Sequence, residues 1–235
     1  MQTLVKTSDT GLADPKISAT LKELHHRAKG DRWIFLRAAP AVALATVRGK
    51  KIFDAVEPYL KDAYIPVDPD QGALLYLTAR AIGARNIVEF GTSFGISTIY
   101  LAAAARANGG RVTGTELESK KADAARANIA QAGLAPFVEV LQGDAMKTLA
   151  TFAEPIDFLL LDGWKDLYLP MIHMLAPKLR AGAIVLADNI FTFKKTLRPY
   201  VAHMQDRANG FESVTLPLGH GMEYSRKCGP ALASI

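Results

Sequence analysis

Residues 86–95 read Asn-Ile-Val-Glu-Phe-Gly-Thr-Ser-Phe-Gly, and this stretch decides the fold. The apolar run 86–90 predicts a strand, the small residues that follow predict a tight turn, and the Ala-rich stretch 95–107 predicts a helix. The turn is not a P-loop, because no lysine follows its second glycine, and it lacks the Gly-x-Gly-x-x-Gly pattern of dinucleotide-binding folds. Alone, such a turn is only weak evidence for a bound ligand.

Short apolar runs and helical stretches alternate along the rest of the chain. This alternation predicts an α/β fold with a doubly wound, mostly parallel sheet, in which ligands bind beyond the carboxyl ends of the strands. The last two runs predict an antiparallel pair. After 86–90 the expected strands are 111–115, 137–141, 156–161, 183–187, 211–217 and 222–226, and the expected helices are 119–132, 145–152, 167–179 and 195–208.

The N-terminal part of the chain has a different pattern. Residues 1–64 predict a helical extension with helices at 15–29, 33–47 and 51–57, and we expect it to cover a substrate pocket or to contact a second copy in a homodimer. A Pro-rich link at 65–70 then leads into a helix at 71–82. We therefore divide the chain into an extension, 1–64, and one α/β domain, 65–235.

Composition excludes several classes of protein. The chain has 235 residues, of which 49% are hydrophobic and 22% charged, so it can bury a core and is not disordered. Its longest mostly apolar run, 38–47, is too short to span a membrane, and residues 1–15 lack the apolar core of a signal peptide. The single cysteine, Cys228, fits a cytoplasmic location. Residues 1–64 carry 11 Lys and Arg against 7 Asp and Glu, which could attract an anionic substrate or RNA.

Acidic residues follow the second and third strands. Glu116 lies where a carboxylate can accept hydrogen bonds from both hydroxyls of a ribose, and Gly143-Asp144-Ala145 could hold an adenine edge. Each acid taken singly could instead cap a helix. Together they indicate a nucleoside ligand without a triphosphate, and S-adenosylmethionine is held in this way.

A second group of polar residues follows the fourth and fifth strands. Asp162, Asp188 and Asn189 would present three hard oxygens to one point if these strands are neighbours, and Mg²⁺ prefers such ligands. The alternative is that the two aspartates cap loops. Lys165 lies three residues beyond Asp162, where a lysine that is partly out of water and beside a cation could act as a general base.

Several blocks resemble the cation-dependent O-methyltransferases, the class I S-adenosylmethionine-dependent family that includes catechol and caffeoyl-CoA O-methyltransferases and their bacterial relatives. The resemblance covers roughly residues 65–227 and implies a Rossmann-like sheet of seven strands. The blocks are VEFGTSFGISTIYLA (88–102), GTELESKKADAARANI (114–129), QGDAMKTL (142–149), FLLLDGWKDLYLP (158–170) and IVLADN (184–189).

The resemblance also implies roles for single residues. Lys165 would be the catalytic base, and the cation, Mg²⁺ or alternatively Mn²⁺ or Ca²⁺, would be held by Asp162, Asp188 and Asn189. The cofactor S-adenosylmethionine would be bound by Glu89, Gly91, Thr92, Ser97, Glu116, Asp144, Ala145 and Asp162.

Three departures from the family pattern concern the acceptor. Ile96 stands where relatives often have tyrosine, and residues 191–195 run directly into a helix without the longer loop common in relatives. Glu212 and Glu223 are candidates for an acid beside the acceptor, although each could be a strand-surface residue. His220 is expected to serve the Gly-rich turn, and Trp164 and Phe191 either stack on an acceptor or pack in the core.

The sequence therefore predicts methyl transfer from S-adenosylmethionine to a hydroxyl of a small ortho-dihydroxy aromatic, assisted by a divalent cation. No membrane partner is expected. The alternatives are an enzyme acting on a hydroxylated tRNA base, whose binding would weaken steeply with salt, and a nucleoside-binding module with a vestigial site.

Overall fold

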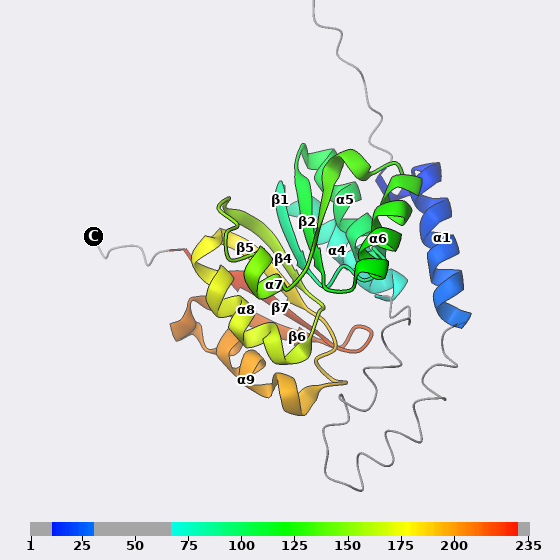
Figure 1. The fold of residues 1–235 in the computed structure, drawn as a ribbon. Coiled ribbons are helices and arrows are strands. Elements are labelled where there is room, and N and C mark those ends of the chain that lie inside the picture. Colours follow the sequence, from blue (N-terminus) through cyan, green and yellow to red (C-terminus); the bar gives the residue numbers. More distant parts are fainter. Residues whose placement is uncertain (1–10, 31–66, 230–235) are drawn as a thin grey trace, which may run out of the picture.

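The computed structural model describes residues 11–30 and 67–229. In this part of the chain a seven-stranded sheet has the order β3-β2-β1-β4-β5-β7-β6 (Figure 1). The first five strands pair in parallel, and β7 is antiparallel to both β5 and β6. The strands are β1 Asn86–Phe90, β2 Arg111–Glu116, β3 Val138–Gln142, β4 Ile156–Leu161, β5 Leu179–Ala187, β6 Phe211–Leu216 and β7 Met222–Lys227.

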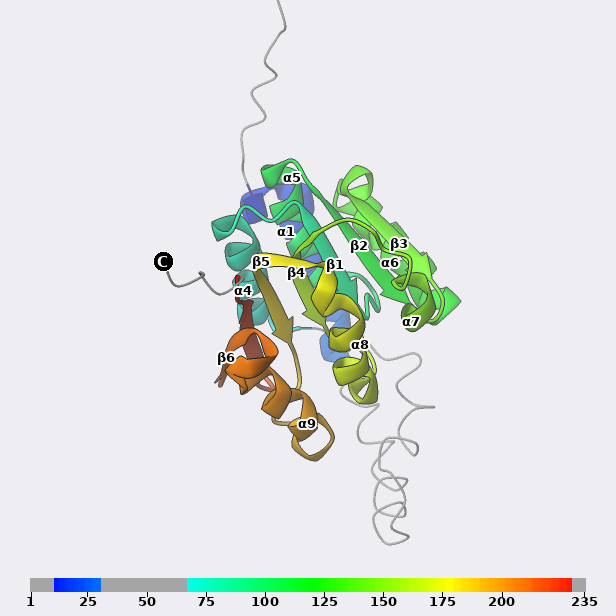
Figure 2. The same ribbon diagram turned by 90° about the vertical axis from the view of Figure 1, so that its left-hand side faces the viewer.

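Helices cover both faces of this sheet, as the alternating pattern predicts (Figures 1 and 2). One apolar cluster joins the sheet to α4, α5 and α6, and a second joins it to α7, α8 and α9. Strand β4 is buried on both faces, which explains its nearly unbroken apolar sequence. The helices are α1 Pro15–Gly30, α4 Pro69–Ala81, α5 Ile96–Asn108, α6 Ser119–Gln131, α7 Ala145–Thr148, α8 Tyr168–Leu175 and α9 Lys194–Gln205.

The chain reverses its winding direction between β1 and β4. The connections from β1 lead outward through β2 to β3, whereas β4 returns to the other side of β1 and leads on to β5. Ligands bind at such a switch point, beyond the carboxyl ends of the strands. The adjacency of β4 and β5, which the cluster of acids requires, is confirmed by the pairing of Leu161 with Ala187.

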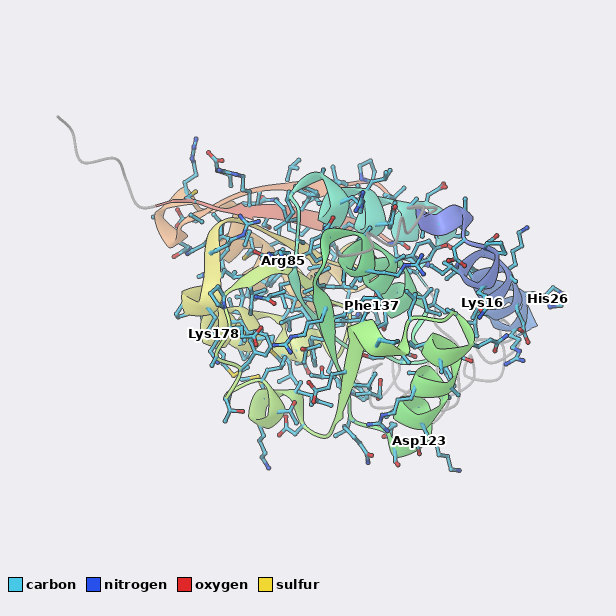
Figure 3. The ribbon with its side chains drawn as sticks, turned by 90° about the horizontal axis from the view of Figure 1, so that it is seen from above. Lys16, His26, Arg85, Asp123, Phe137 and Lys178 are labelled. Carbon is cyan, nitrogen blue, oxygen red and sulfur yellow. The ribbon has the colours of Figure 1, made fainter. Side chains whose placement is uncertain are left out.

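Helix α1 packs against the domain through one apolar face. Ile17, Leu21 and Leu24 recur at helical spacing and are buried in the cluster that contains α4, α5 and α6. Viewed from above, Lys16 and His26 label this helix at one side of the molecule, and Lys178 lies toward the opposite side (Figure 3). The expected helices 33–47 and 51–57 lie outside the described residues.

Two helices are shorter in the structure than the sequence predicts. The expected helix 145–152 is a single turn, α7, and the expected helix 167–179 is α8 flanked by 3₁₀ turns. The α-helix cannot continue normally through Pro177, which has no N–H and fits the first turn of a short 3₁₀ helix instead. Strand β5 consequently begins at Leu179, four residues before the expected start.

A helix must be long and apolar to cross a lipid bilayer. Within residues 11–30 and 67–229, every helix is too short or too polar to span one.

Candidate functional site

A cavity of about 490 Å³ opens at the carboxyl ends of the parallel strands. Its lining comes from the loops that follow β1, β2, β3, β4 and β5, together with Val67 and His220. This is the position that the doubly wound topology predicts for a ligand. Among the residues singled out from the sequence, the cavity is lined by Gly91, Thr92, Ser97, Glu116, Asp144, Ala145, Asp162, Lys165 and Asn189.

The loop after β1 requires glycine for steric reasons. Gly91 has a φ of 97°, and a Cβ atom there would lie 2.6 Å from the backbone of Gly163, which belongs to the loop after β4. The two loops on either side of the switch point therefore touch through backbone alone. Both glycines also line the cavity, so a molecule there would meet main chain and not side chains at this point.

Glu89 lies directly behind this loop and is fully buried. Its Oε1 accepts a hydrogen bond from Ser97, and its Oε2 accepts from Thr92 and Thr98. Burial raises the pKa of Glu89 to about 7, against the lowering effect of these hydroxyls. Glu89 itself does not line the cavity, contrary to the expectation of a direct contact with the cofactor, but Thr92 and Ser97, which donate to it, do.

The two acids that follow β2 and β3 have different local roles. Both carboxylate oxygens of Glu116 accept backbone N–H groups, one from Ser93 and one from Glu118, so the side chain is held at the cavity wall. Asp144 is the N-cap of α7 and accepts a hydrogen bond from the backbone of Met146. The capping alternative for Asp144 is therefore present in the structure, and the residue also lines the cavity.

The acids after β4 and β5 form a buried, mutually repelling pair. Burial raises the pKa of Asp162, and the negative charge of Asp188 raises it further, while Lys165 lowers it. Burial also raises the pKa of Asp188, against hydrogen bonds from the Asn189 backbone and from Gln71. Two such carboxylates with the carboxamide of Asn189 beside them form a hard-oxygen donor set, whose negative charge a divalent cation would compensate.

Few side chains are available as ligands for such a cation. Among the described residues, no three His, Cys, Asp or Glu side chains converge as a metal site, so two carboxylates and one carboxamide are the candidate protein ligands. Asn189 has a φ of 66°, a conformation that asparagine tolerates better than most residues. The side chain of Asn189 hydrogen-bonds Asp188 Oδ2 at 3.2 Å, which keeps the two groups together.

Lys165 lies in the 3₁₀ turn Lys165–Leu167 that follows β4, and it faces this acidic pair. Its Nζ donates to Asp162 Oδ1 at 3.0 Å and to the hydroxyl of Tyr168 at 2.8 Å. Only 10% of its side chain is exposed, and Nζ also lies 5.9 Å from the ring centroid of Phe193. Lys165 also lines the cavity, so its side chain lies within reach of a molecule there.

Sequence reasoning assigned no role at the site to three residues that lie there. Tyr168 is fully buried and bonds Lys165, and Gln71 donates to Asp188 Oδ1 at 2.7 Å. His220, which was expected to serve only a turn, lines the cavity. The apolar spacing around Tyr168 indicates a core position, and nothing in the local pattern near Gln71 points to a partner in the loop after β5.

The two C-terminal acids lie away from the cavity lining. Glu212 is on the surface, where it pairs with Arg207 and Arg226. Glu223 is fully buried and accepts hydrogen bonds from Gln205, Ser213 and Thr215. Neither is among the cavity-lining residues, so the structure gives neither one a contact with a ligand there.

Comparison with known proteins relates this site to methyl transfer. Residues 88–190 match a family described as a methyltransferase domain. Over 127 residues, 54% of its length, the chain is 41% identical to a catechol O-methyltransferase of Mycobacterium tuberculosis; over 137 residues, 57% of its length, it is 36% identical to one of Niastella koreensis. The chain covers 57% and 62% of the lengths of these two relatives.

Solved structures extend the similarity to most of the chain. The cofactor-bound structure of Rv0187 from MTB aligns with a TM-score of 0.66 and 30% identity, and the alignment covers 80% of this chain and 95% of that one. An O-methyltransferase from Bacillus cereus in complex with SAH aligns with a TM-score of 0.64 and 28% identity, covering 74% of this chain and 97% of that one. The chain therefore belongs to the S-adenosylmethionine-dependent O-methyltransferase family.

Proposed function

We propose that this protein transfers the methyl group of S-adenosylmethionine to one hydroxyl of a small ortho-dihydroxy aromatic, with help from a divalent cation. The observation that carries the proposal is the cluster of Lys165, Asp162, Asp188 and Asn189: the first two and Asn189 line the cavity, and the buried Asp188 contacts Asn189. The similarity to two bacterial catechol O-methyltransferases supports the same acceptor class.

The cofactor would occupy the part of the cavity formed by the loops after β1, β2 and β3. When bound, S-adenosylmethionine supplies a methyl group on a positively charged sulfur. The backbone at Gly91 and the hydroxyls of Thr92 and Ser97 would face its methionine end. Glu116, already held by two backbone N–H groups, has oxygen lone pairs left to accept hydrogen bonds from ribose hydroxyls. Asp144 and Ala145 would border the adenine.

The cation would lie against Asp162, Asp188 and Asn189. When bound, it supplies Lewis acidity that makes an acceptor hydroxyl easier to deprotonate. The fit is electrostatic, because the two buried carboxylates repel each other and a divalent charge between them would offset that repulsion. Gln71 holds Asp188 and Lys165 holds Asp162, so the orientation of each carboxylate is set by a neighbour.

Lys165 would take the proton from the acceptor hydroxyl. Lys165 would accept that proton at Nζ, and bound S-adenosylmethionine would supply the methyl group, its sulfur keeping the electron pair of the broken carbon–sulfur bond. The apolar side chains of Trp164, Leu167 and Phe193 line the same cavity and suit a flat aromatic acceptor. Holding both molecules in attack geometry would provide much of the rate enhancement.

The test measures transfer from radiolabelled S-adenosylmethionine to 3,4-dihydroxybenzoate, with Mg²⁺ and with EDTA. We expect labelled product with Mg²⁺ and none with EDTA. Transfer that persists in EDTA would contradict the cation assignment. If no product forms in either condition, the acceptor proposal is wrong, and unfractionated tRNA as acceptor then tests the alternative reading.

A further inference from the structure

We propose that Tyr168 is a positioning residue, which sets the direction in which the Lys165 amine faces the acceptor. This inference rests on the proposed function, because it assumes that Lys165 moves a proton. Tyr168 does not line the cavity. Its role therefore has to pass through Lys165.

Tyr168 links the candidate base to the strand that carries the candidate cation ligands. Its hydroxyl accepts a hydrogen bond from Lys165 Nζ at 2.8 Å and donates one to the backbone carbonyl of Asp188 at 3.2 Å. Because the hydroxyl proton goes to that carbonyl, the phenol oxygen offers only lone pairs to Lys165. The turn after β4 and the end of β5 are thus joined through one buried hydroxyl.

The geometry of the amine explains what this contact does. A tetrahedral nitrogen has three positions besides its bond to carbon, and two of them are taken here by Asp162 Oδ1 and by the Tyr168 hydroxyl. Only the third position remains for exchanging a proton with a molecule in the cavity. Without Tyr168 the amine could rotate about its last carbon–nitrogen bond, and its third position would face the acceptor for a smaller fraction of the time.

The ring of Tyr168 is held rigidly enough to serve this purpose. It is fully buried at the first residue of α8, and it packs edge-on against Phe90 and Tyr200, with centroid distances of 6.4 and 5.5 Å. Buried aromatic contacts of this kind restrict a side chain to one rotamer. Replacing the hydroxyl alone should therefore leave the ring where it is.

Tyr200 provides a matched control in the same part of the core. It is a tyrosine with 1% exposure, it touches Tyr168, and its hydroxyl has no hydrogen-bond partner among the described residues. Tyr168→Phe and Tyr200→Phe each remove one buried hydroxyl. Only the first removes a contact with Lys165.

The kinetic test compares the two variants with the wild-type enzyme. We expect Tyr168→Phe to lower kcat about tenfold, the effect of losing one buried hydrogen bond, while KM for S-adenosylmethionine and for 3,4-dihydroxybenzoate stays within about twofold. Tyr200→Phe should keep the wild-type kcat. Equal kcat values in the two variants, or a Tyr168→Phe effect confined to KM, would overturn the proposal.

A second measurement does not depend on turnover. The rate at which Lys165 reacts with acetic anhydride is followed by peptide mass spectrometry in the three folded proteins. Release from Tyr168 should raise the labelling rate of Lys165 severalfold in Tyr168→Phe and leave it unchanged in Tyr200→Phe. An unchanged labelling rate in Tyr168→Phe would refute the proposal that Tyr168 positions the Lys165 amine. Absence of methyl transfer by the wild-type enzyme refutes the proposed function instead, so the two failures are distinguishable.

Discussion

Gln71 and Asp188 are 117 positions apart in the chain, and a buried hydrogen bond of 2.7 Å joins Gln71 Nε2 to Asp188 Oδ1. The same glutamine accepts the backbone N–H of Asp68 in the capping box that begins α4. One side chain therefore fixes both the start of this helix and the orientation of a candidate cation ligand. Val67, which lines the cavity, directly precedes the cap.

Replacing Gln71 should weaken cation binding without removing a ligand. We expect Gln71→Met to lower the affinity for Mn²⁺ about tenfold, because Asp188 loses the partner that orients it. Isothermal titration with Mn²⁺ measures this directly. Gln131→Met, at an exposed glutamine on α6, is the control and should bind like the wild type. Equal Mn²⁺ affinity in both variants would show that Gln71 has no influence on the ligand.

Removing the candidate base should affect turnover and not cofactor binding. For Lys165→Ala we expect kcat to fall by about 10²- to 10⁴-fold, the usual contribution of a general base. The Kd for S-adenosylmethionine should change little, since Lys165 contacts Asp162 and Tyr168 at the acceptor end. Single-turnover kinetics and equilibrium binding separate the two quantities. Lys16→Ala on α1 controls for loss of a lysine charge, and matching losses in kcat and affinity would rule out the base assignment.

The local sequence pattern correctly predicts the central strands of the sheet. The bounds of β1 and β4 agree with the expected strands to the residue, because their buried apolar runs are bounded by turn-forming residues. The placement of Asp162 and Asp188 at neighbouring strand ends also follows from alternation and a short crossover. These features depend on residues close together in the chain.

Contacts between distant segments could not be predicted in the same way. Tyr168 occupies an apolar position of α8, and its polar contacts depend on Lys165 and on the backbone of Asp188, just after β5. Gln71 meets Asp188 only after the sheet has formed. His220 reaches the cavity because β7 returns antiparallel beside β5. In each case, the partner is determined by tertiary packing, which one-dimensional periodicity does not encode.

The buried carboxyl of Glu89 should make stability depend on pH. Its pKa is raised from 4.5 to about 7, mainly by burial, so the folded state retains a proton that the unfolded state has lost. Stability from this group is fully present below pH 4.5 and is lost as the pH rises through 7. The loss amounts to about 3 kcal/mol, at 1.36 kcal/mol for each pH unit.

Glu89→Gln removes this titration and nearly preserves the shape of the side chain. Urea denaturation between pH 4.5 and 7.5 should therefore show a flatter dependence of the unfolding free energy on pH in the variant than in the wild type. Glu139→Gln, at an exposed position of β3, should keep the wild-type slope. Parallel curves for Glu89→Gln and the wild type would contradict a raised pKa at this carboxyl.

The contact between Gly91 and Gly163 should be intolerant of even one added carbon. Gly91→Ala places a Cβ atom 2.6 Å from the Gly163 backbone at a φ of 97°, so the loops after β1 and β4 must separate. Gly83→Ala is the matched control, because Gly83 also has a positive φ, 62°, but open space around its missing Cβ. The control isolates the backbone strain, which is about 1–2 kcal/mol.

We expect Gly91→Ala to lose clearly more stability than Gly83→Ala in thermal melts. We also expect Gly91→Ala to lose affinity for S-adenosylmethionine, which Gly83→Ala retains. Equal stability and affinity in the two variants would mean that the close approach of these loops does not shape the cofactor pocket.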